Sequence, residues 1–254
     1  QEIHFLRDQV EGTSEQLWSN YPGLIDDVEP GHRILIDDGN VALRVVDKSP
    51  DALRCKVEVG GEITDHKGIN LPDSKVSTPA LTRKDLADLD WAVEHDLDWL
   101  ALSFVRTPED VHRLRTLLDG KESSIHIVAK IEKPEALNHL DEIIALSDGV
   151  MVARGDLGVE MDLTRVPVVQ KEIALRCQQE GKPVIIATQM LQSMVEQALP
   201  TRAEVSDVAN AILDWTDAVM LSAETAIGRH PVSAVEYIRR IADQTESFDR
   251  RLGQ

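Results

Sequence analysis

The sequence has 254 residues and carries 27 basic and 45 acidic side chains, which gives a formal net charge of −18. Such acidity argues against a protein that binds nucleic acid or an anionic membrane, because both functions need a basic surface. No apolar run reaches the length of a membrane-spanning helix. Cys55 and Cys177 lie far apart and lack Cys or His partners at metal-ligand spacing, so we expect reduced thiols in a cytoplasmic protein.

Residues 1–75 predict a small domain of antiparallel β-strands. Short apolar–polar alternations are typical of half-buried strands, and turn-forming segments such as 29–31, 37–40 and 48–51 separate them. The expected strands are residues 2–6, 33–36, 41–46 and 53–59.

Residues 76–254 predict a different domain, in which strands alternate with helices. The expected strands are 97–105, 125–131, 149–153, 183–188 and 218–221, and the expected helices are 83–95, 107–119, 134–146, about 164–180, 202–214 and 231–247. Helix-start signals support two of them, since Thr107 precedes a proline and Thr201 stands three residues before Glu204. This alternation favours an α/β fold with a parallel sheet.

Polar residues at the strand ends favour a (β/α)₈ TIM barrel over a doubly wound layer. Barrel chemistry comes from the carboxyl ends of several strands, whereas a doubly wound layer concentrates its signal in one glycine-rich turn, and no G-x-G-x-x-G motif occurs. The polar residues at these ends are Ser103, Arg106, Lys130, Glu132, Arg154, Asp156, Thr188, Gln189, Ser222 and Glu224. Only strands 4–8 of such a barrel are visible, and we expect the first three before Gln1.

The strongest candidate site combines Lys130 with Glu132 and Asp156. Side chains alternate along a strand, so Lys130 and Glu132 point the same way, and Asp156 follows the next strand. Two carboxylates beside an ammonium suit a divalent cation and an oxyanionic substrate. Alternatively, each carboxylate is a helix cap or surface acid, and Lys130 forms a Schiff base.

Other residues give weaker signals. The turn that contains Gly155 and Asp156 could present backbone N–H groups to an anion, and Thr188 could donate to the same anion. Arg154 and Arg106 could contact anions or form ion pairs. We assign the four tryptophans, Trp18, Trp91, Trp99 and Trp215, to packing.

Several stretches of the sequence resemble the pyruvate kinase family, and the resemblance extends over nearly the whole chain. The most specific motif is Ala153-Arg154-Gly155-Asp156-Leu157-Gly158, and the likeness is carried by residues 67–72, 102–106, 129–132, 151–160, 187–191, 200–211 and 218–225. The resemblance implies that residues 1–75 are most of a mobile lid (B) domain, a small antiparallel β-barrel that closes over a nucleotide. Residues 76–254 would be the later part of the catalytic barrel (A) domain.

The resemblance also implies a reaction, in which phosphoenolpyruvate and ADP give pyruvate and ATP in the last step of glycolysis. Lys130 would stabilise the transition state, Glu132 and Asp156 would hold Mg²⁺ or Mn²⁺, and Gly155, Asp156 and Thr188 would bind the carboxylate end of phosphoenolpyruvate or pyruvate. K⁺ is also implied, with ligands outside this segment, and the family is usually tetrameric. Further candidate contacts are Ser103, Arg154, Ser222 and Glu224, with Asp38 and Lys67 near the lid cleft.

Two alternatives stay open at this point. A metal-dependent lyase or aldolase acting on a pyruvate enolate would share the carboxylates and the carboxylate-binding turn, but would not need a nucleotide lid. A non-catalytic relative or fragment would keep the fold without the upstream residues. Because part of the family's site is expected before Gln1, we expect this segment to be inactive by itself.

Overall fold

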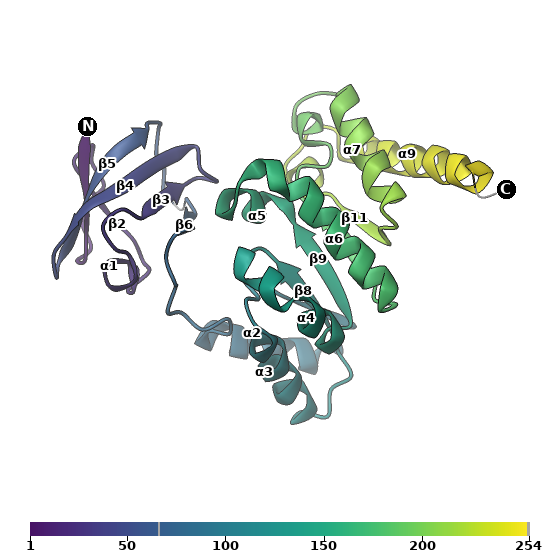
Figure 1. The fold of residues 1–254 in the computed structure, drawn as a ribbon, viewed down its shortest axis with the longest axis horizontal. Coiled ribbons are helices and arrows are strands. Elements are labelled where there is room, and N and C mark those ends of the chain that lie inside the picture. The colour runs from purple at the N-terminus through teal and green to yellow at the C-terminus, as the bar shows by residue number, and fades with distance from the viewer. Residues whose placement is uncertain (66, 253–254) are drawn as a thin grey trace. The chain divides into compact units, whose positions relative to one another are not determined.

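The chain folds into two compact units, each built around its own sheet. A computed structural model describes residues 1–65 and 67–252, with side chains described up to residue 249. One unit comprises Gln1–Pro79 and Val159–Asp162, and the other comprises Ala80–Gly158 and Leu163–Gln254 (Figure 1). The fold is mixed α/β, with a six-stranded sheet in the first unit and a five-stranded parallel sheet in the second.

The first unit is mostly antiparallel, as its alternating pattern predicts. Its elements are β1 (Glu2–Leu6), β2 (Gln16–Trp18), α1 (Leu24–Asp27), β3 (Arg33–Ile36), β4 (Val41–Lys48), β5 (Ala52–Val59) and β6 (Ile69–Asn70). The strand order is β2-β1-β5-β4-β3-β6. One pair departs from the prediction, since β1 and β2 run parallel. The nine residues between these strands give the chain room to return to the same end of β1.

Alternation along the strands builds the core of this unit. Val41, Leu43 and Val45 of β4 are buried, and they meet Phe5 and Leu53 from other strands in one apolar cluster. Burying such large side chains contributes about 1.5–3 kcal/mol each. The period of two therefore fixes which face of each strand turns inward.

The second unit alternates strands and helices, and its five strands pair in chain order. Its elements are α2 (Arg83–Glu94), β7 (Trp99–Leu102), α3 (Pro108–Asp119), β8 (His126–Ile131), η1 (Pro134–His139), α4 (Leu140–Leu146), β9 (Gly149–Ala153), α5 (Arg154–Glu160), η2 (Leu163–Arg165), α6 (Val166–Gln179), β10 (Val184–Ala187), η3 (Gln192–Val195), α7 (Arg202–Leu213), β11 (Ala218–Met220), α8 (Ala223–Ala226) and α9 (Pro231–Leu252). The order β11-β10-β9-β8-β7, parallel throughout, lacks the reversal of a doubly wound sheet.

Local sequence signals start the helices where they were expected. The side chain of Asp85 accepts from the backbone N–H of Thr82 before α2, and Glu204 accepts from that of Thr201 before α7. Each of these pairs is a capping box that satisfies N–H groups at a helix start. The single helix predicted over 134–146 is instead a 3₁₀ segment followed by α4. The short helices α5 and α8 were not predicted.

The two faces of the parallel sheet have different surroundings. Ile127 and Ile131 of β8 and Val152 of β9 are fully buried, and this face packs on helices such as α3 and α6. The opposite face carries an apolar cluster that includes Val128 and Met151. Because side chains alternate, Lys130 shares the face of Val128. Its ammonium therefore lies beyond an apolar layer, at the end of the strand.

Aspartates bridge neighbouring strands at the amino edge of this sheet. Asp148, just before β9, accepts from the backbone N–H of Ile127 in β8 at 2.7 Å and also bonds the guanidinium of Arg115. Asp217, just before β11, accepts from the N–H of Val184 in β10 at 2.8 Å. Partial burial would raise the pKa of Asp148, but the bonds from Ile127 and Arg115 outweigh it and the pKa is lowered.

The assignment to packing was wrong for three of the four tryptophans. Trp91, Trp99 and Trp215 are 55, 46 and 63% exposed. Two of them stack on histidine rings, with centroids 4.1 Å apart for Trp91 and His95 and 4.7 Å for Trp99 and His126. These side chains lie at helix ends and at the first residue of an edge strand, where little of the unit covers them.

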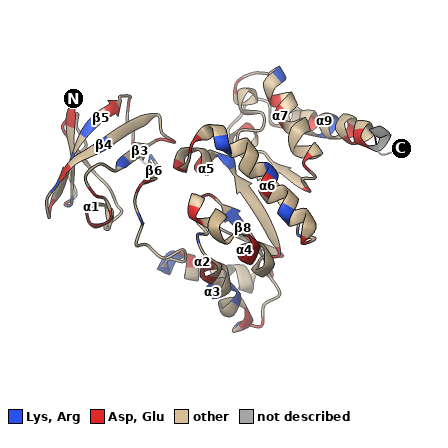
Figure 2. Cartoon of the chain, in the orientation of Figure 1, with Lys and Arg blue, Asp and Glu red and all other residues tan. Residues whose placement is uncertain are grey.

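Charge is distributed over both units. Figure 2 shows acidic and basic residues interspersed along the helices. Across the described residues, no helix is both long and apolar enough to cross a membrane.

Candidate active site at the carboxyl edge of the parallel sheet

Lys130 and Glu132 lie in direct contact at the end of β8. The Lys130 Nζ is 2.6 Å from Glu132 Oε1 and donates to Ser103 Oγ, beyond the end of β7, at 2.9 Å. The lysine side chain is 23% exposed and Glu132 is 1% exposed. A buried carboxylate needs such partners, because an unpaired buried charge is costly. Alternation along the strand correctly predicted that both side chains face the same way.

Glu132 also holds the backbone of the preceding strand end. Its Oε2 accepts from the N–H of Phe104 at 2.6 Å. Phe104 has φ of 55°, in the left-handed region that bulky residues rarely occupy. Such a conformation costs about 1–3 kcal/mol and persists only where neighbouring contacts hold it. Glu132 therefore fixes the turn that presents Ser103 to Lys130.

Asp156 leaves the same edge of the sheet from the next strand. In the register of β8 and β9, Ile131 lies opposite Val152. Glu132 follows β8 at the same edge where β9 ends and α5 begins, and the first turn of α5 contains Asp156. Asp156 is half-buried.

The donor set of this edge fits a magnesium-type ion. Each carboxylate oxygen has a second lone pair, so Glu132 can accept beyond its present bonds. Within residues 1–65 and 67–252, no group of three or more His, Cys, Asp or Glu could hold a metal by itself. A site of two carboxylates completed by substrate oxygens and water is the usual style for Mg²⁺.

Gly155 and Thr188 meet between β9 and β10. The Gly155 N–H donates to Thr188 Oγ1 at 2.7 Å. A Cβ at position 155 would lie 3.2 Å from that oxygen, so a side chain there would push the hydroxyl away. Thr188 and Gln189 have φ of 72° and 54°, and this left-handed conformation is unusual for a β-branched residue such as Thr188. The Gly155 amide predicted to face an anion is bonded to Thr188 here.

Arg154 is bonded within the protein. Its Nη1 lies 2.8 Å from the Asp207 carboxylate on α7, and its Nη2 donates to the Thr188 carbonyl at 2.8 Å. Of the two roles left open from the sequence, ion pairing is the one these contacts support.

Glu224 is fully buried and ties β11 to the end of β10. It accepts from the N–H of Leu191 at 3.1 Å and from that of Ser222 at 2.8 Å. These bonds give Glu224 a structural role in holding the loop that follows Thr188.

Comparison with known proteins identifies the family of this chain. A family model described as pyruvate kinase, barrel domain, matches residues 3–235. The chain belongs to the pyruvate kinase family.

Among its relatives, the pyruvate kinase of Methylorubrum extorquens is 49% identical over 239 residues, which cover 94% of this chain and 49% of the relative. That of Corynebacterium efficiens is 46% identical over 248 residues, covering 98% and 52%. That of Mycobacterium tuberculosis is 48% identical over 231 residues, covering 91% and 49%. The chain thus spans about half the length of the curated relatives it matches.

Two of the candidate site residues, Lys67 and Asp38, lie in the first unit. The Lys67 Nζ is 2.7 Å from Asp37 Oδ1, and this hydrogen bond raises the pKa of Lys67 and lowers that of Asp37. Asp38 is the next residue in the turn between β3 and β4, with φ of 54°. Lys67 therefore pairs with Asp37, the neighbour of Asp38.

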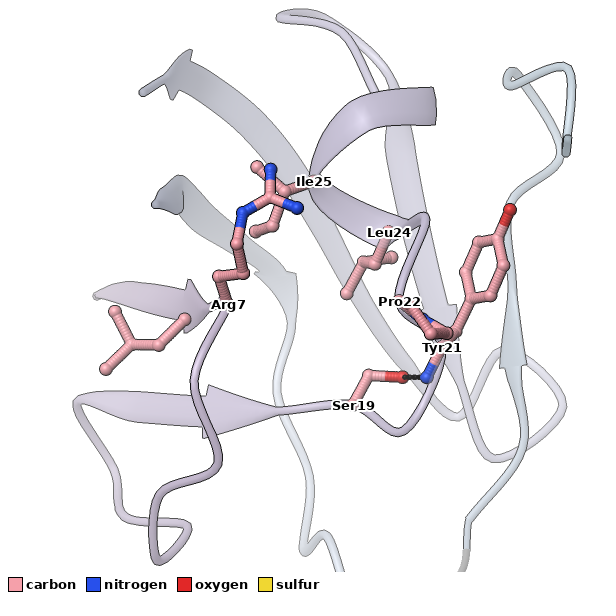
Figure 3. Close-up of a pocket in the computed structure, with 7 residues that line it drawn as sticks. Arg7, Ser19, Tyr21, Pro22, Leu24 and Ile25 are labelled. Carbon is pink, nitrogen blue, oxygen red and sulfur yellow. Dashed lines mark hydrogen bonds between the residues drawn. The ribbon is translucent and has the colours of Figure 1, made fainter. Parts of the chain in front are cut away.

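A pocket of about 260 Å³ also lies in the first unit (Figure 3). Of the seven described residues that line it, none is among the site residues predicted from the sequence. Arg7, the charged residue of the lining, makes two hydrogen bonds to Asp26 and so is already neutralised.

The roles of several residues that organise the strand ends were not predicted from the sequence. Phe104 and Leu191 take part through their backbone N–H groups, which carry no sequence signal. Asp207 lies 53 residues from Arg154 along the chain. The resemblance to pyruvate kinase covered position 207 but gave no partner for it.

Proposed function

We propose that the protein containing this chain transfers the phosphoryl group of phosphoenolpyruvate to ADP, giving pyruvate and ATP. The observation that carries the proposal is the contact of Lys130 with Glu132 and Ser103 at the carboxyl edge of a parallel sheet. Parallel α/β barrels perform their chemistry at this edge. Membership of the pyruvate kinase family supports the same reaction.

In this proposal Lys130 neutralises charge on the reacting oxygens. An ammonium has three N–H donors, of which Ser103 and Glu132 engage two, and we assign the third to a substrate oxygen. Phosphoryl transfer depends on positioning and electrostatic stabilisation more than on covalent catalysis. The apolar layer below Lys130 limits the solvent around the ammonium, which strengthens its interaction with an oxyanion.

We assign Glu132 and Asp156 to a divalent cation, Mg²⁺ or Mn²⁺. When bound, such an ion supplies positive charge to phosphate and enolate oxygens. Glu132 then serves both the cation and Lys130, and its bond to Phe104 fixes its orientation. K⁺ dependence remains an expectation from the family.

The substrate carboxylate is assigned to Gly155, Asp156 and Thr188. Supporting this assignment, α5 begins at this point, and N–H groups at a helix start favour an anion. Ser222, Glu224, Lys67 and Asp38 remain weaker candidates. Glu224 would act by holding the loop around Leu191 rather than by touching substrate.

The domain assignments are part of the same proposal. Residues 1–75 are proposed as the small β lid (B) domain and residues 76–254 as the later part of a (β/α)₈ barrel (A) domain. Parallel strands in chain order, each followed by helical structure, support the barrel. A tetramer in the cytoplasm is proposed from the family alone.

An assay of the full-length protein tests the function. Phosphoenolpyruvate, ADP, Mg²⁺ and K⁺ are supplied, and pyruvate and ATP are both measured. Equal formation of the two products supports the kinase. Pyruvate formed without ADP would instead indicate a phosphatase or lyase activity on the same enolate. Glu132→Gln is expected to raise the Mg²⁺ concentration needed for half-maximal rate by about tenfold or more, since ligand-shell changes weaken metal affinity on that scale.

A further inference from the structure

Arg154 has the contacts of a residue that positions another residue. Its side chain is 11% exposed, and its two terminal nitrogens reach three elements. Nη1 contacts Asp207 on α7 at 2.8 Å and Gln170 Oε1 on α6 at 3.3 Å. Nη2 donates to the Thr188 carbonyl at 2.8 Å and contacts Met190 Sδ at 2.9 Å. This guanidinium is therefore committed to the protein rather than to an anion.

Thr188 needs such a contact, because its backbone is strained. Its φ is 72°, and that of Gln189 is 54°, so two consecutive residues occupy the left-handed region directly after β10. A β-branched residue keeps this conformation only when its surroundings impose it. The bond from Arg154 to its carbonyl is one of the contacts that do so.

Two consecutive residues hold Thr188 from opposite ends. Arg154 binds its carbonyl, and the Gly155 N–H binds its Oγ1 at 2.7 Å. A shift of the Thr188 backbone would therefore move the hydroxyl and release the Gly155 amide at the same time. Both groups belong to the proposed carboxylate site.

We propose that Arg154 is a positioning residue, which fixes Thr188 and, through its hydroxyl, the Gly155 turn of the proposed carboxylate site. This inference rests on the function proposed above, and it assigns Arg154 a role distinct from direct substrate contact. Because α7 supplies Asp207 and α6 supplies Gln170, the guanidinium links those two helices to the turn that follows β10.

The shape of the guanidinium matters more than its charge in this role. Its planar fork reaches Asp207 with one nitrogen and Thr188 with the other. An ammonium is a compact point charge on a single stem, so lysine can restore the pair with Asp207 but not both bonds. If Arg154 served only to neutralise Asp207, lysine would suffice.

Steady-state kinetics of the full-length protein separate these roles. Arg154→Lys is expected to raise KM for phosphoenolpyruvate by about tenfold or more while KM for ADP stays within about twofold, since small displacements at a binding site cost that much. Asp207→Asn, which keeps the bond to Thr188, is expected to have the smaller effect. Arg176→Lys is the matched control, because Arg176 pairs with Asp141 and Glu172 on the surface.

Hydrogen–deuterium exchange supplies a readout that does not need turnover. In Arg154→Lys, a peptide covering residues 153–158 should exchange faster while one covering 126–131 is unchanged, because only the former contains the Gly155 amide. A structural role alone would accelerate both. If the variant fails to fold, the double variant Arg154→Met with Asp207→Asn removes both charges together and should show the same local exchange and KM split.

Three results would overturn the proposal. These are wild-type KM and exchange in Arg154→Lys, an effect of Asp207→Asn as large as that of Arg154→Lys, or equal changes in both KM values. If the wild-type protein has no kinase activity, the proposed function fails, but the exchange measurement still decides whether Arg154 holds the Gly155 amide.

Discussion

The two edges of the parallel sheet use the same kinds of bond for different purposes. At the amino edge, Asp148 and Asp217 accept backbone N–H groups from neighbouring strands. At the carboxyl edge, Glu132 and Glu224 accept backbone N–H groups of residues that follow neighbouring strands. The difference lies in what the bonds hold. The aspartates bond residues within regular strands, whereas Glu132 bonds the strained Phe104.

Backbone strain separates the edges as well. At the amino edge, left-handed residues follow helices, such as Asp96 after α2, Gly181 after α6 and Trp215 after α7. This conformation commonly ends helices. At the carboxyl edge, Phe104, Thr188 and Gln189 lie one or two residues after strands, where no helix termination requires this conformation. Carboxyl-edge strain therefore orients proposed functional groups, and amino-edge strain only ends helices.

The sharpest test of this contrast is Lys130→Gln in the full-length protein. The amide can still donate to Ser103 and Glu132 but carries no charge, so we expect kcat to fall about 10²- to 10³-fold. Steady-state rates at saturating phosphoenolpyruvate, ADP and Mg²⁺ measure the effect, and circular dichroism checks the fold. A fall of less than about tenfold would contradict the assigned role of Lys130.

Glu224→Gln should mainly reduce stability. The buried side chain would keep one carbonyl-type acceptor in place of two carboxylate oxygens, leaving one N–H of Leu191 or Ser222 without its acceptor. We expect the free energy of unfolding to fall by about 1–3 kcal/mol. Urea unfolding measures it, and Glu172→Gln, on the exposed surface of α6, should change it by at most about 1 kcal/mol. Equal losses of unfolding free energy in the two variants would contradict this prediction.

Asp148→Asn should reduce stability at neutral pH by about 1 kcal/mol and leave kcat within about twofold. Because the pKa of Asp148 is lowered in the folded protein, its carboxylate stabilises the fold above the unfolded pKa of about 3.9. That contribution is lost as the pH falls through the folded pKa. The stability difference between wild type and variant should therefore shrink in acid, which urea unfolding at a series of pH values would measure. A constant difference would contradict the assignment.

Trp215→Gly tests strain at the amino edge and carries the smallest expected effect. Glycine occupies the left-handed region without penalty, and the indole is 63% exposed, so we expect a gain of about 0.5–1 kcal/mol in unfolding free energy with unchanged kcat. Thermal unfolding measures the gain. Loss of activity would mean that amino-edge strain also serves function.

Patterns that depend on period were predictable from the sequence. The apolar run 149–153 became β9 with the same bounds, because a strand buried on both faces is a continuous apolar segment. The shared orientation of Lys130 and Glu132 follows from the period of two. Capping boxes likewise act over three residues, and those of Thr201 and Thr82 form as the local chemistry requires.

Features that depend on distant contacts were not predictable. The glycines near Gly155 indicate a bend, yet the segment forms α5, with Leu157 fully buried. Phe104 has no local preference for positive φ, and its bond to the distant Glu132 helps to hold that conformation. The partner of Arg154 comes from a helix far along the chain. The metal and substrate assignments remain predictions.

The chain-order pairing of the parallel strands affects how this part of the protein is made. Each strand from β8 to β11 pairs with the one synthesised just before it. By contrast, the antiparallel partner of β1 in the first unit is the distant β5, since Glu2 pairs with Lys56. Short sequence separations favour fast folding. The parallel sheet can therefore grow strand by strand as the ribosome releases it, whereas the pairing of β1 with β5 needs more than fifty further residues after Glu2.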